Sequence, residues 1–433
     1  MRPASAATLL RGLGRAASSL RTASPLSEAN AAASLLVTRI AQAYAEDSAA
    51  ASLKKTPLYN FHLERGGKMV PWGGWTMPYH YQDSIMEAAS HCRTSASLFD
   101  VSHACSFTLK GRDAIPFLER LVVSDIAGLA NGSSCLSMFT NERGGIIDDT
   151  VVTRVADDEL FLVVNAGCRD KDLAHLGRQL AGYKGDVRMT VHDDRALLAL
   201  QGPQAARALQ RYMEQDLDNV YFNQFLKADI RGIPCLMTRT GYTGEDGFEI
   251  SVPSDMAVGL AAALLGDERV RLCGMAARYS LRLEAGLCRY GSDLTEDVTP
   301  IEAGLGWTVG KRRRERFDFL GGEVIRRQLA EGVSIRRMGL VTDGSDPAHE
   351  HSEVLTPEGQ RVGKITSGAF SPCLQRNIAM GYVDKTFAKA GTPLSVVVHG
   401  RPQEATVAKM PFLLTRYHKA PQVTLPVREL IAA

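Results

Sequence analysis

The sequence lacks the signatures of several large protein classes. Its eight cysteines include no Cys-x-x-Cys pair and no Cys/His cluster at zinc spacing, so we expect no metal site. It has no Gly-x-x-x-x-Gly-Lys-Ser/Thr loop and no Gly-x-Ser-x-Gly elbow, which removes the usual motifs of nucleotide hydrolysis and serine hydrolases. Gly12 and Gly14 follow no predicted strand, so they do not open a dinucleotide-binding fingerprint. Scattered free thiols are typical of a reducing compartment.

Long apolar runs and a strong net charge are also missing. No run of 18 apolar residues is present, so we expect no membrane span. A net charge of +2 over 433 residues gives no overall basic field, so nucleic acid is not an expected partner. A composition of 45% hydrophobic and 23% charged residues is typical of a soluble globular protein, and the length predicts about two to four domains.

Residues 1–50 differ in composition from the rest of the chain. No acidic residue precedes Glu28, whereas four arginines do: Arg2, Arg11, Arg15 and Arg21. Apolar side chains recur at helical spacing along one face, at Leu9, Leu13, Ala16 and Leu20. An Arg- and Ser-rich, acid-poor N-terminus is typical of an organelle transit peptide. We predict a disordered transit peptide over residues 1–50, with a mitochondrial address first and a plastid address second; the alternative is a disordered tail of biased composition.

The middle of the chain alternates helical and strand-like patterns, which predicts an α+β fold. Helices are expected over 84–96, 113–122, 169–181 and 204–212, and strands over 136–139, 146–155, 160–164, 187–192 and 196–201. From Arg336 onward, short strand candidates separated by turn residues predict a small antiparallel barrel or sandwich. These strands are 337–342, 361–368, 378–383, 394–399 and 403–408. We expect two α+β domains within residues 55–333 and a barrel domain over residues 334–420.

A glycine-punctuated turn followed by an alternating strand, at residues 241–252, is the most informative local pattern. Phe248, Ile250 and Val252 alternate with Glu249, so the apolar side chains and the acid lie on opposite faces of a strand. A carboxylate on a rigid strand can accept two parallel N–H bonds from a planar heterocycle. A solvated strand residue is the alternative interpretation of Glu249.

Several separated segments together resemble one known family. They are residues 71–78 (PWGGWTMP), 97–103 (SLFDVSH), 139–149 (FTNERGGIIDD), 198–203 (LALQGP), 241–247 (GYTGEDG), 281–286 (LRLEAG), 299–304 (TPIEAG) and 378–382 (IAMGY). In this order they resemble the aminomethyltransferase (T-protein) of the glycine cleavage system, and the resemblance covers about residues 55–417.

The resemblance implies a fold, a reaction and partners. The implied fold has three domains in a cloverleaf around a central folate channel, with a small antiparallel β-barrel at the C-terminus. The implied enzyme takes an aminomethyl group from the lipoyl arm of the H-protein and passes the one-carbon unit to tetrahydrofolate, releasing ammonia. The P- and L-proteins of the same system are further implied partners, and the implied location is the mitochondrial matrix.

Site residues are also implied by the resemblance. Asp100 matches an active-site aspartate, and a fixed carboxylate favours the positive charge that develops as the transferred carbon loses its amine. Glu249 matches the acid that pairs with the pterin N–H groups. The remaining expected contacts of the cofactor are Tyr242, Arg278, Tyr417 and, as an apolar contact, Met77.

A compact basic run follows Gly310. Because the H-protein of the family is acidic, Lys311, Arg312, Arg313 and Arg314 are predicted to speed its encounter; a solvated charge run is the alternative. Three residues depart from the family pattern: Ala104 replaces a methionine, Tyr279 an aspartate and His349 an arginine.

Two other functions remain open from the sequence. A folate-dependent demethylase on the same scaffold would need a different substrate pocket, which spacing alone does not exclude. A non-enzymatic folate-binding factor for iron–sulfur assembly would carry a Lys-Gly-Cys-x-x-Gly-Gln-Glu segment. The corresponding stretch here, residues 319–323, lacks the cysteine, which argues against that alternative.

Overall fold

The structure is a computed structural model of the chain, and it describes residues 53–421. The predicted transit peptide over residues 1–50 lies outside the described residues. Within residues 53–421, no helix combines the length and the apolar character needed to cross a bilayer.

The described chain begins with a small three-stranded sheet. Its order is β1 (Lys54–Lys55), β3 (Trp75–His80) and β2 (Lys68–Trp72), and the short helix α2 (Tyr59–Glu64) follows β1. Phe61 of α2 joins the core of the next sheet, which ties this N-terminal piece to the main body.

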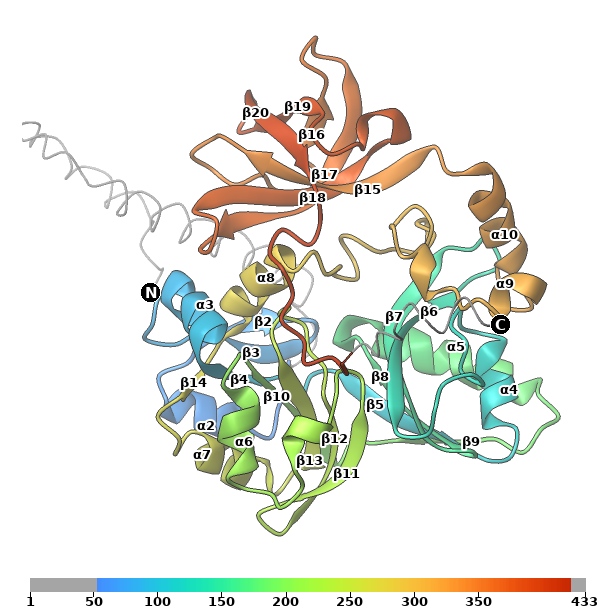
Figure 1. Cartoon of the computed structure of the whole chain (residues 1–433), viewed down its shortest axis with the longest axis vertical. Helices are drawn as coiled ribbons and strands as arrows, with labels where there is room; N and C mark the ends of the chain where they lie inside the picture. The colour runs from blue at the N-terminus through green and yellow to red at the C-terminus, as the bar shows by residue number, and fades with distance from the viewer. Residues whose placement is uncertain (1–52, 422–433) are drawn as a thin grey trace, which may run out of the picture. The chain divides into compact units, whose positions relative to one another are not determined.

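A six-stranded sheet forms the next layer (Figure 1). Its order is β11 (Phe225–Ile230), β12 (Ile233–Thr238), β13 (Gly247–Pro253), β10 (Arg195–Gln201), β4 (Ala96–Asp100) and β14 (Val270–Leu272). Apolar residues of α6 (Ala205–Gln210) and α7 (Ala257–Leu264) share one core with this sheet, and those of α3 (Ile85–Thr94) and α8 (Met275–Glu284) share another. Helices therefore cover both faces.

The start of α3 shows why the predicted helix over 84–96 forms. The Ser84 hydroxyl accepts a hydrogen bond from the Glu87 backbone N–H, and the Glu87 carboxylate accepts one from the Ser84 backbone N–H. This capping box satisfies two backbone donors that the first turn of a helix leaves unpaired. The helix predicted over 169–181 is confirmed at the same bounds as α5 (Arg169–Ala181).

A five-stranded antiparallel sheet is formed by the part of the chain between β4 and β10 (Figure 1, teal). Its order is β6 (Ser133–Thr140), β7 (Ile146–Ala156), β8 (Glu159–Val164), β5 (Cys105–Lys110) and β9 (Arg188–Val191). The helices α4 (Ala114–Glu119) and α5 pack on one face of it, and their shared core is fully buried at Phe107, Leu118 and Leu176. The hairpin predicted around residues 141–145 is confirmed as the β6–β7 connection.

A helical connection leads to the last sheet. It contains α9 (Arg313–Arg316) and α10 (Gly322–Glu331). Short 3-10 turns lie elsewhere in the described part of the chain: η1 (Ala166–Cys168), η2 (Leu217–Asn219), η3 (Gly306–Thr308) and η4 (Lys385–Phe387).

The last sheet is a closed six-stranded barrel (Figure 1, orange to red). Its order is β15 (Ile335–Thr342), β18 (Arg376–Asp384), β17 (Arg361–Ser371), β16 (Glu353–Leu355), β19 (Pro393–Val398) and β20 (Arg401–Ala408). The sequence predicted five of these strands and missed β16, which has three residues. β16 completes the circle by pairing with β17 and β19. The predicted α+β class and C-terminal antiparallel barrel are confirmed.

A buried ion pair joins α8 to the barrel. The Arg282 guanidinium lies 2.6 Å from a carboxylate oxygen of Asp293, and both side chains are at most 1% exposed. The other carboxylate oxygen of Asp293 accepts hydrogen bonds from Thr366 and Ser367 of β17. Burying two charges is costly unless their hydrogen bonds are satisfied, and here the barrel supplies the missing donors.

We expect Asp293→Ala to destabilise the protein by about 3–5 kcal/mol, because the Arg282 charge then stays buried without its partner. Urea unfolding at neutral pH measures the change. Glu323→Ala is the matched control: it removes the partner of Arg326 in a pair that is 71% and 58% exposed, so the loss of stability should be far smaller. Equal losses for the two variants would contradict the prediction.

Candidate functional site

A cavity of about 1280 Å³ lies among the six-stranded sheet, the five-stranded sheet, α8 and the segment after β20. Among the predicted cofactor contacts, Tyr242, Glu249, Arg278 and Tyr417 line it. The fifth, Met77, does not line it and is 0% exposed, so its side chain belongs to the core.

Glu249 reaches the cavity because of strand alternation. Phe248, Ile250 and Val252 are fully buried in one core, so Glu249 lies on the opposite face, which α8 covers. Arg278 comes from α8 and lines the same cavity. Burial raises the pKa of the Glu249 carboxyl, and the charge of Arg278 opposes that shift.

Arg278 leaves hydrogen-bonding capacity unused. Its Nη1 is buried without a hydrogen-bond partner among the described residues, and its guanidinium lies 4.9 Å from the centre of the Tyr242 ring. No hydrogen bond to the Glu249 carboxylate is found within residues 53–421 either. Buried polar groups are normally paired, so an acid and an arginine held this way suit a polar ligand that supplies the missing bonds.

Aromatic side chains form other parts of the wall. The Tyr242 hydroxyl donates to the backbone carbonyl of Cys288. Tyr417 stacks on Phe222 with ring centroids 4.1 Å apart and an interplanar angle of 14°. Both tyrosines are thus held in place by protein contacts. Because their rings are already fixed, little side-chain entropy is lost when a planar ligand binds against them.

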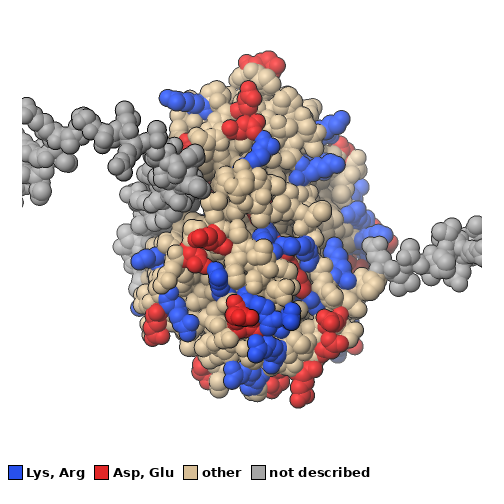
Figure 2. All heavy atoms as spheres, turned by 60° about the vertical axis from the view of Figure 1, so that its left-hand side comes forward, with Lys and Arg blue, Asp and Glu red and all other residues tan. Residues whose placement is uncertain are grey.

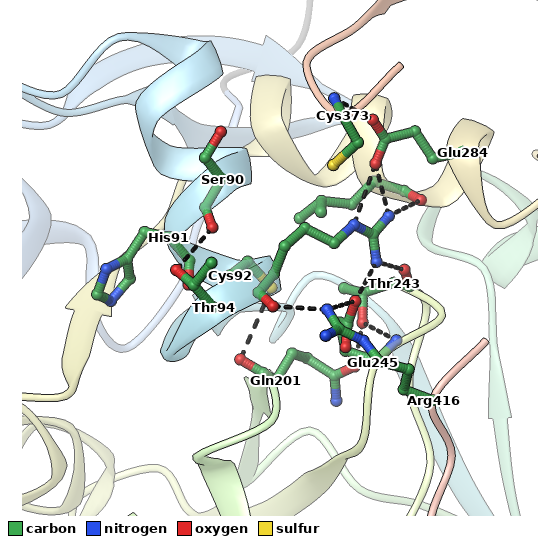
Figure 3. A network of polar contacts seen from close by, with 12 residues as sticks. Ser90, His91, Cys92, Thr94, Gln201, Thr243, Glu245, Glu284, Cys373 and Arg416 are labelled. Carbon is green, nitrogen blue, oxygen red and sulfur yellow. Dashed lines mark hydrogen bonds and ion pairs between the residues drawn. The ribbon is translucent and has the colours of Figure 1, made fainter. Parts of the chain in front are cut away.

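A network around Arg93 of α3 fixes the segments that carry these residues (Figure 3). The Arg93 guanidinium donates to Glu284 at 2.7 Å, to Glu245 at 2.8 Å and to the backbone carbonyl of Thr243 at 2.6 Å. Arg416, in the segment after β20, donates to the same Glu245 oxygen at 2.7 Å. One buried arginine therefore joins α3, α8, the 241–247 turn and the C-terminal segment.

Glycine at Gly247 allows the turn to approach the sheet this closely. A Cβ atom there would lie 2.4 Å from the backbone carbonyl oxygen of Leu200, a distance that no side chain accommodates. Gln201 then closes the turn, because its amide donates to the carbonyl of Thr240 at 2.9 Å and its carbonyl accepts from the Thr243 hydroxyl at 2.8 Å.

Asp100 lies on the other face of the sheet. It pairs in register with Leu198, whereas Phe99, Ala199 and Glu249 form the next row, so Asp100 and Glu249 point in opposite directions. Asp100 is 3% exposed and does not line the cavity.

The Asp100 carboxylate is already occupied by the protein. It accepts bonds from the Thr56 hydroxyl at 2.6 Å, from His62 Nε2 at 2.9 Å and from the Ser102 backbone N–H at 2.9 Å. Burial alone would raise the pKa of Asp100, but these bonds and the neighbouring His62 hold it below its usual value. The geometry therefore does not support the catalytic role predicted for Asp100.

Asp149 is the cavity acid that the sequence analysis missed. It follows Asp148 on β7, and Asp148 is fully buried whereas Asp149 lines the cavity. Asn165 Nδ2 donates to both aspartates, at 2.8 Å to Asp148 and at 2.9 Å to Asp149. Burial, and then the charge of Asp148, raise the pKa of Asp149 to about 7. The pair was visible in the resembling segment 139–149, but no role was assigned to it.

Other residues singled out from the sequence take varied positions. His103 lines the cavity, and burial lowers its pKa to about 4, which keeps the imidazole neutral near pH 7. Of the departures from the family pattern, Ala104 and Tyr279 line the cavity. His349 packs against His399 with ring centroids 5.4 Å apart.

Most of the basic run makes internal contacts. Arg313 is 2% exposed and lies 2.7 Å from Asp318, so its side chain is not available to a partner. Arg312 forms ion pairs with Glu119 and with Asp125, the latter at 2.7 Å.

The rest of the run is exposed. Arg314 donates to the carbonyls of Val309 and Gly306, and Lys311 is exposed. On the face shown in Figure 2, Lys and Arg side chains lie interspersed with Asp and Glu side chains. The docking role stays a prediction for Lys311, Arg312 and Arg314.

Comparisons with known proteins agree with the fold. The GCVT N-terminal domain family matches residues 58–313, and the glycine cleavage T-protein C-terminal barrel domain family matches residues 336–413. The chain is 58% identical over 376 residues to "Aminomethyltransferase, mitochondrial" of Mesembryanthemum crystallinum, covering 86% of this chain and 92% of that relative. The protein of the same name from Canis lupus familiaris is 50% identical over 370 residues, covering 84% and 91%.

A solved structure is also similar. The crystal structure of glycine cleavage system aminomethyltransferase T from Bartonella henselae matches with a TM-score of 0.81 at 40% identity, covering 85% of this chain and 100% of that one.

We expect Asp149→Asn and Asp100→Asn to change the pH dependence of stability differently. A raised carboxyl pKa means that the folded protein binds more protons, so stability is lost as pH rises from about 4 to about 7; Asp149→Asn removes this loss. The pKa of Asp100 is lowered, so its contribution is lost only in acid. Thermal unfolding midpoints, measured between about pH 5 and 8, test this. Relative to wild type, the midpoint of Asp149→Asn should rise with increasing pH, whereas the midpoint of Asp100→Asn should stay lower by a constant amount. Parallel curves for the two variants would refute this assignment.

Proposed function

The chain belongs to the aminomethyltransferase (T-protein) family of the glycine cleavage system, and on that premise we propose that it transfers a one-carbon unit from aminomethylated H-protein to tetrahydrofolate. The products are 5,10-methylenetetrahydrofolate, ammonia and dihydrolipoyl H-protein. The chain is an enzyme of the aminomethyltransferase class, as its curated relatives are.

The presence of Glu249 and Arg278 together in the cavity wall, with hydrogen-bonding capacity left unused, is the observation that carries the proposal. A pterin ring presents adjacent N–H donors and ring acceptors on one edge, and a carboxylate accepts such donors in pairs. The unpartnered Arg278 Nη1 supplies a donor beside it. Tyr242 and Tyr417 give flat apolar surfaces that suit the ring faces.

Asp149 is proposed to stabilise the reacting charge. The transferred carbon becomes positively charged as its amine leaves, and a fixed carboxylate favours that charge. At ~4 Å the attraction is about 1 kcal/mol in water and about 4 kcal/mol at an effective dielectric constant of ~20. These energies correspond to rate factors of roughly 10 to 10³. Asn165 keeps the carboxylate in the cavity wall.

The partners and location follow from the same family membership. We propose the lipoylated H-protein as the donor, with the P- and L-proteins acting in the same system, and the exposed members of the 311–314 run as one contact region. The curated relatives carry "mitochondrial" in their names, and the acid-poor N-terminus supports the mitochondrial matrix as the location.

We expect Glu249→Gln to weaken tetrahydrofolate binding by about 10- to 100-fold, because a charge-assisted pair of hydrogen bonds is lost. Calorimetric titration measures the affinity. Glu350→Gln is the matched control, since Glu350 also lines the cavity but is solvent-exposed. Unchanged affinity in Glu249→Gln, with the fold intact, would reject the proposed pterin contact.

We expect Asp149→Asn to lower kcat by roughly 10- to 10³-fold while tetrahydrofolate still binds, because the carboxylate acts on the reacting charge. In the wild type, kcat should rise as pH increases through about 7, where the Asp149 carboxyl ionises. Ammonia release from aminomethylated H-protein, with and without tetrahydrofolate, provides the assay. Asp100→Asn should keep the wild-type kcat under conditions in which the variant is folded. If kcat fell in Asp100→Asn and not in Asp149→Asn, the carboxylate that stabilises the reacting charge would be Asp100.

A further inference from the structure

A buried acidic group lies behind the Asp149 wall of the cavity. The side-chain ligand atoms of Asp148, Cys168 and Asp172 all lie within 4.8 Å of one another, and the three residues are at most 3% exposed. Neither carboxylate oxygen of Asp172 has a hydrogen-bond partner among the described residues. Two ionised carboxylates this close in a buried place repel each other strongly, so something positive must lie between them.

A proton fits this place better than a metal ion. Both oxygens of Asp148 already accept bonds from Asn165, at 2.9 Å from its backbone N–H and at 2.8 Å from its amide. Those donors favour the ionised form of Asp148, so a shared proton belongs on Asp172. Within residues 53–421 the group offers three protein ligands, fewer than the four of a structural zinc site.

The electrostatics agree with that placement. Burial, and then the charge of Asp148, raise the pKa of Asp172 to about 10. Burial also raises the pKa of the Cys168 thiol well above its usual value, so the thiol stays protonated. Asp172 lies in the first turn of α5, where the helix dipole favours a carboxylate, but that effect is small compared with burial beside a like charge.

We propose that Asp172 is a neutral carboxylic acid that donates its proton to Asp148 and so positions Asn165 and Asp149 in the cavity wall. Asp148 holds the Asn165 side chain, and the same Asn165 amide donates to Asp149 at 2.9 Å. Asp172 itself does not line the cavity, so it is a positioning residue. Its effect on turnover rests on the proposed function, whereas its protonation state does not.

Charged and titratable groups from several elements surround this cluster. They are Lys171 on α5, Asp149 on β7, and Tyr290, Asp293 and Glu296 in the connection after α8. Lys171 donates to the Tyr290 hydroxyl at 2.5 Å and lies 3.3 Å from Glu296, so its charge is shared with groups outside the pair.

The protonation state can be measured without turnover. The infrared difference spectrum between wild type and Asp172→Asn at neutral pH should contain a protonated-carboxyl band that shifts in D2O. Asp170→Asn is the matched control, because Asp170 is exposed on the same first turn and should show carboxylate bands only. Carboxylate bands alone in Asp172→Asn would overturn the proposal.

Kinetics test the positioning role. Asp172→Ala removes the donor to Asp148, and we expect kcat to fall by about 10- to 100-fold, because small misplacements of a reacting group are costly. Asp172→Asn still donates an N–H and keeps the net charge of a neutral acid, so it should rescue the rate lost in Asp172→Ala. Its kcat should also keep the wild-type dependence on pH near 7.

Other outcomes separate the explanations. If Asp172 were ionised, Asp172→Asn would remove a negative charge near Asp149 and move the pH dependence of kcat to lower pH, which would overturn the proposal. A metal ion retained by the purified wild type in a one-to-one ratio and lost in Asp172→Asn would do the same. If the infrared band is present but wild type shows no tetrahydrofolate-dependent turnover, the proposed function fails and the protonation of Asp172 stands.

Discussion

The buried guanidinium of Arg93 is where four parts of the chain meet, and the cavity walls depend on it. A buried charge is tolerated only when its donors are paired, and the Arg93 nitrogens reach two carboxylates and two backbone carbonyls. Those acceptors lie on α8 and on the 241–247 turn. The same contacts therefore fix the elements that present Arg278 and Tyr242, so stability and site geometry are consequences of one set of hydrogen bonds.

Local pattern was enough to predict much of the fold. Ser84 and Glu87 specify the start of α3, and the alternation around Glu249 predicts which face of its strand is polar. The three-residue strand β16 carries too little pattern to be recognised, although it closes the barrel. Its partner β17 follows directly in the chain, but its other partner, β19, lies farther on, and no local propensity records that second pairing.

The position of Asp100 outside the cavity lining has a definite physical origin. A family resemblance locates a segment but leaves open which way each side chain of a strand points. Only the register of β4, β10 and β13 shows that Asp100 and Glu249 point to opposite faces of one sheet. The same alternation separates Asp148 from Asp149: Asp148 points towards α5, and Asp149 points into the cavity. Asn165, which donates hydrogen bonds to both, follows the end of the neighbouring strand β8.

Tyr417 enters the cavity from beyond the last barrel strand, and this has a consequence for the order of folding. Its stack on Phe222 and the pairing of Arg416 with Glu245 join segments that lie far apart in the chain. Contacts of this kind form late, because the long loop between their partners must first be closed. The cavity is therefore complete only after the sheets and the barrel have folded.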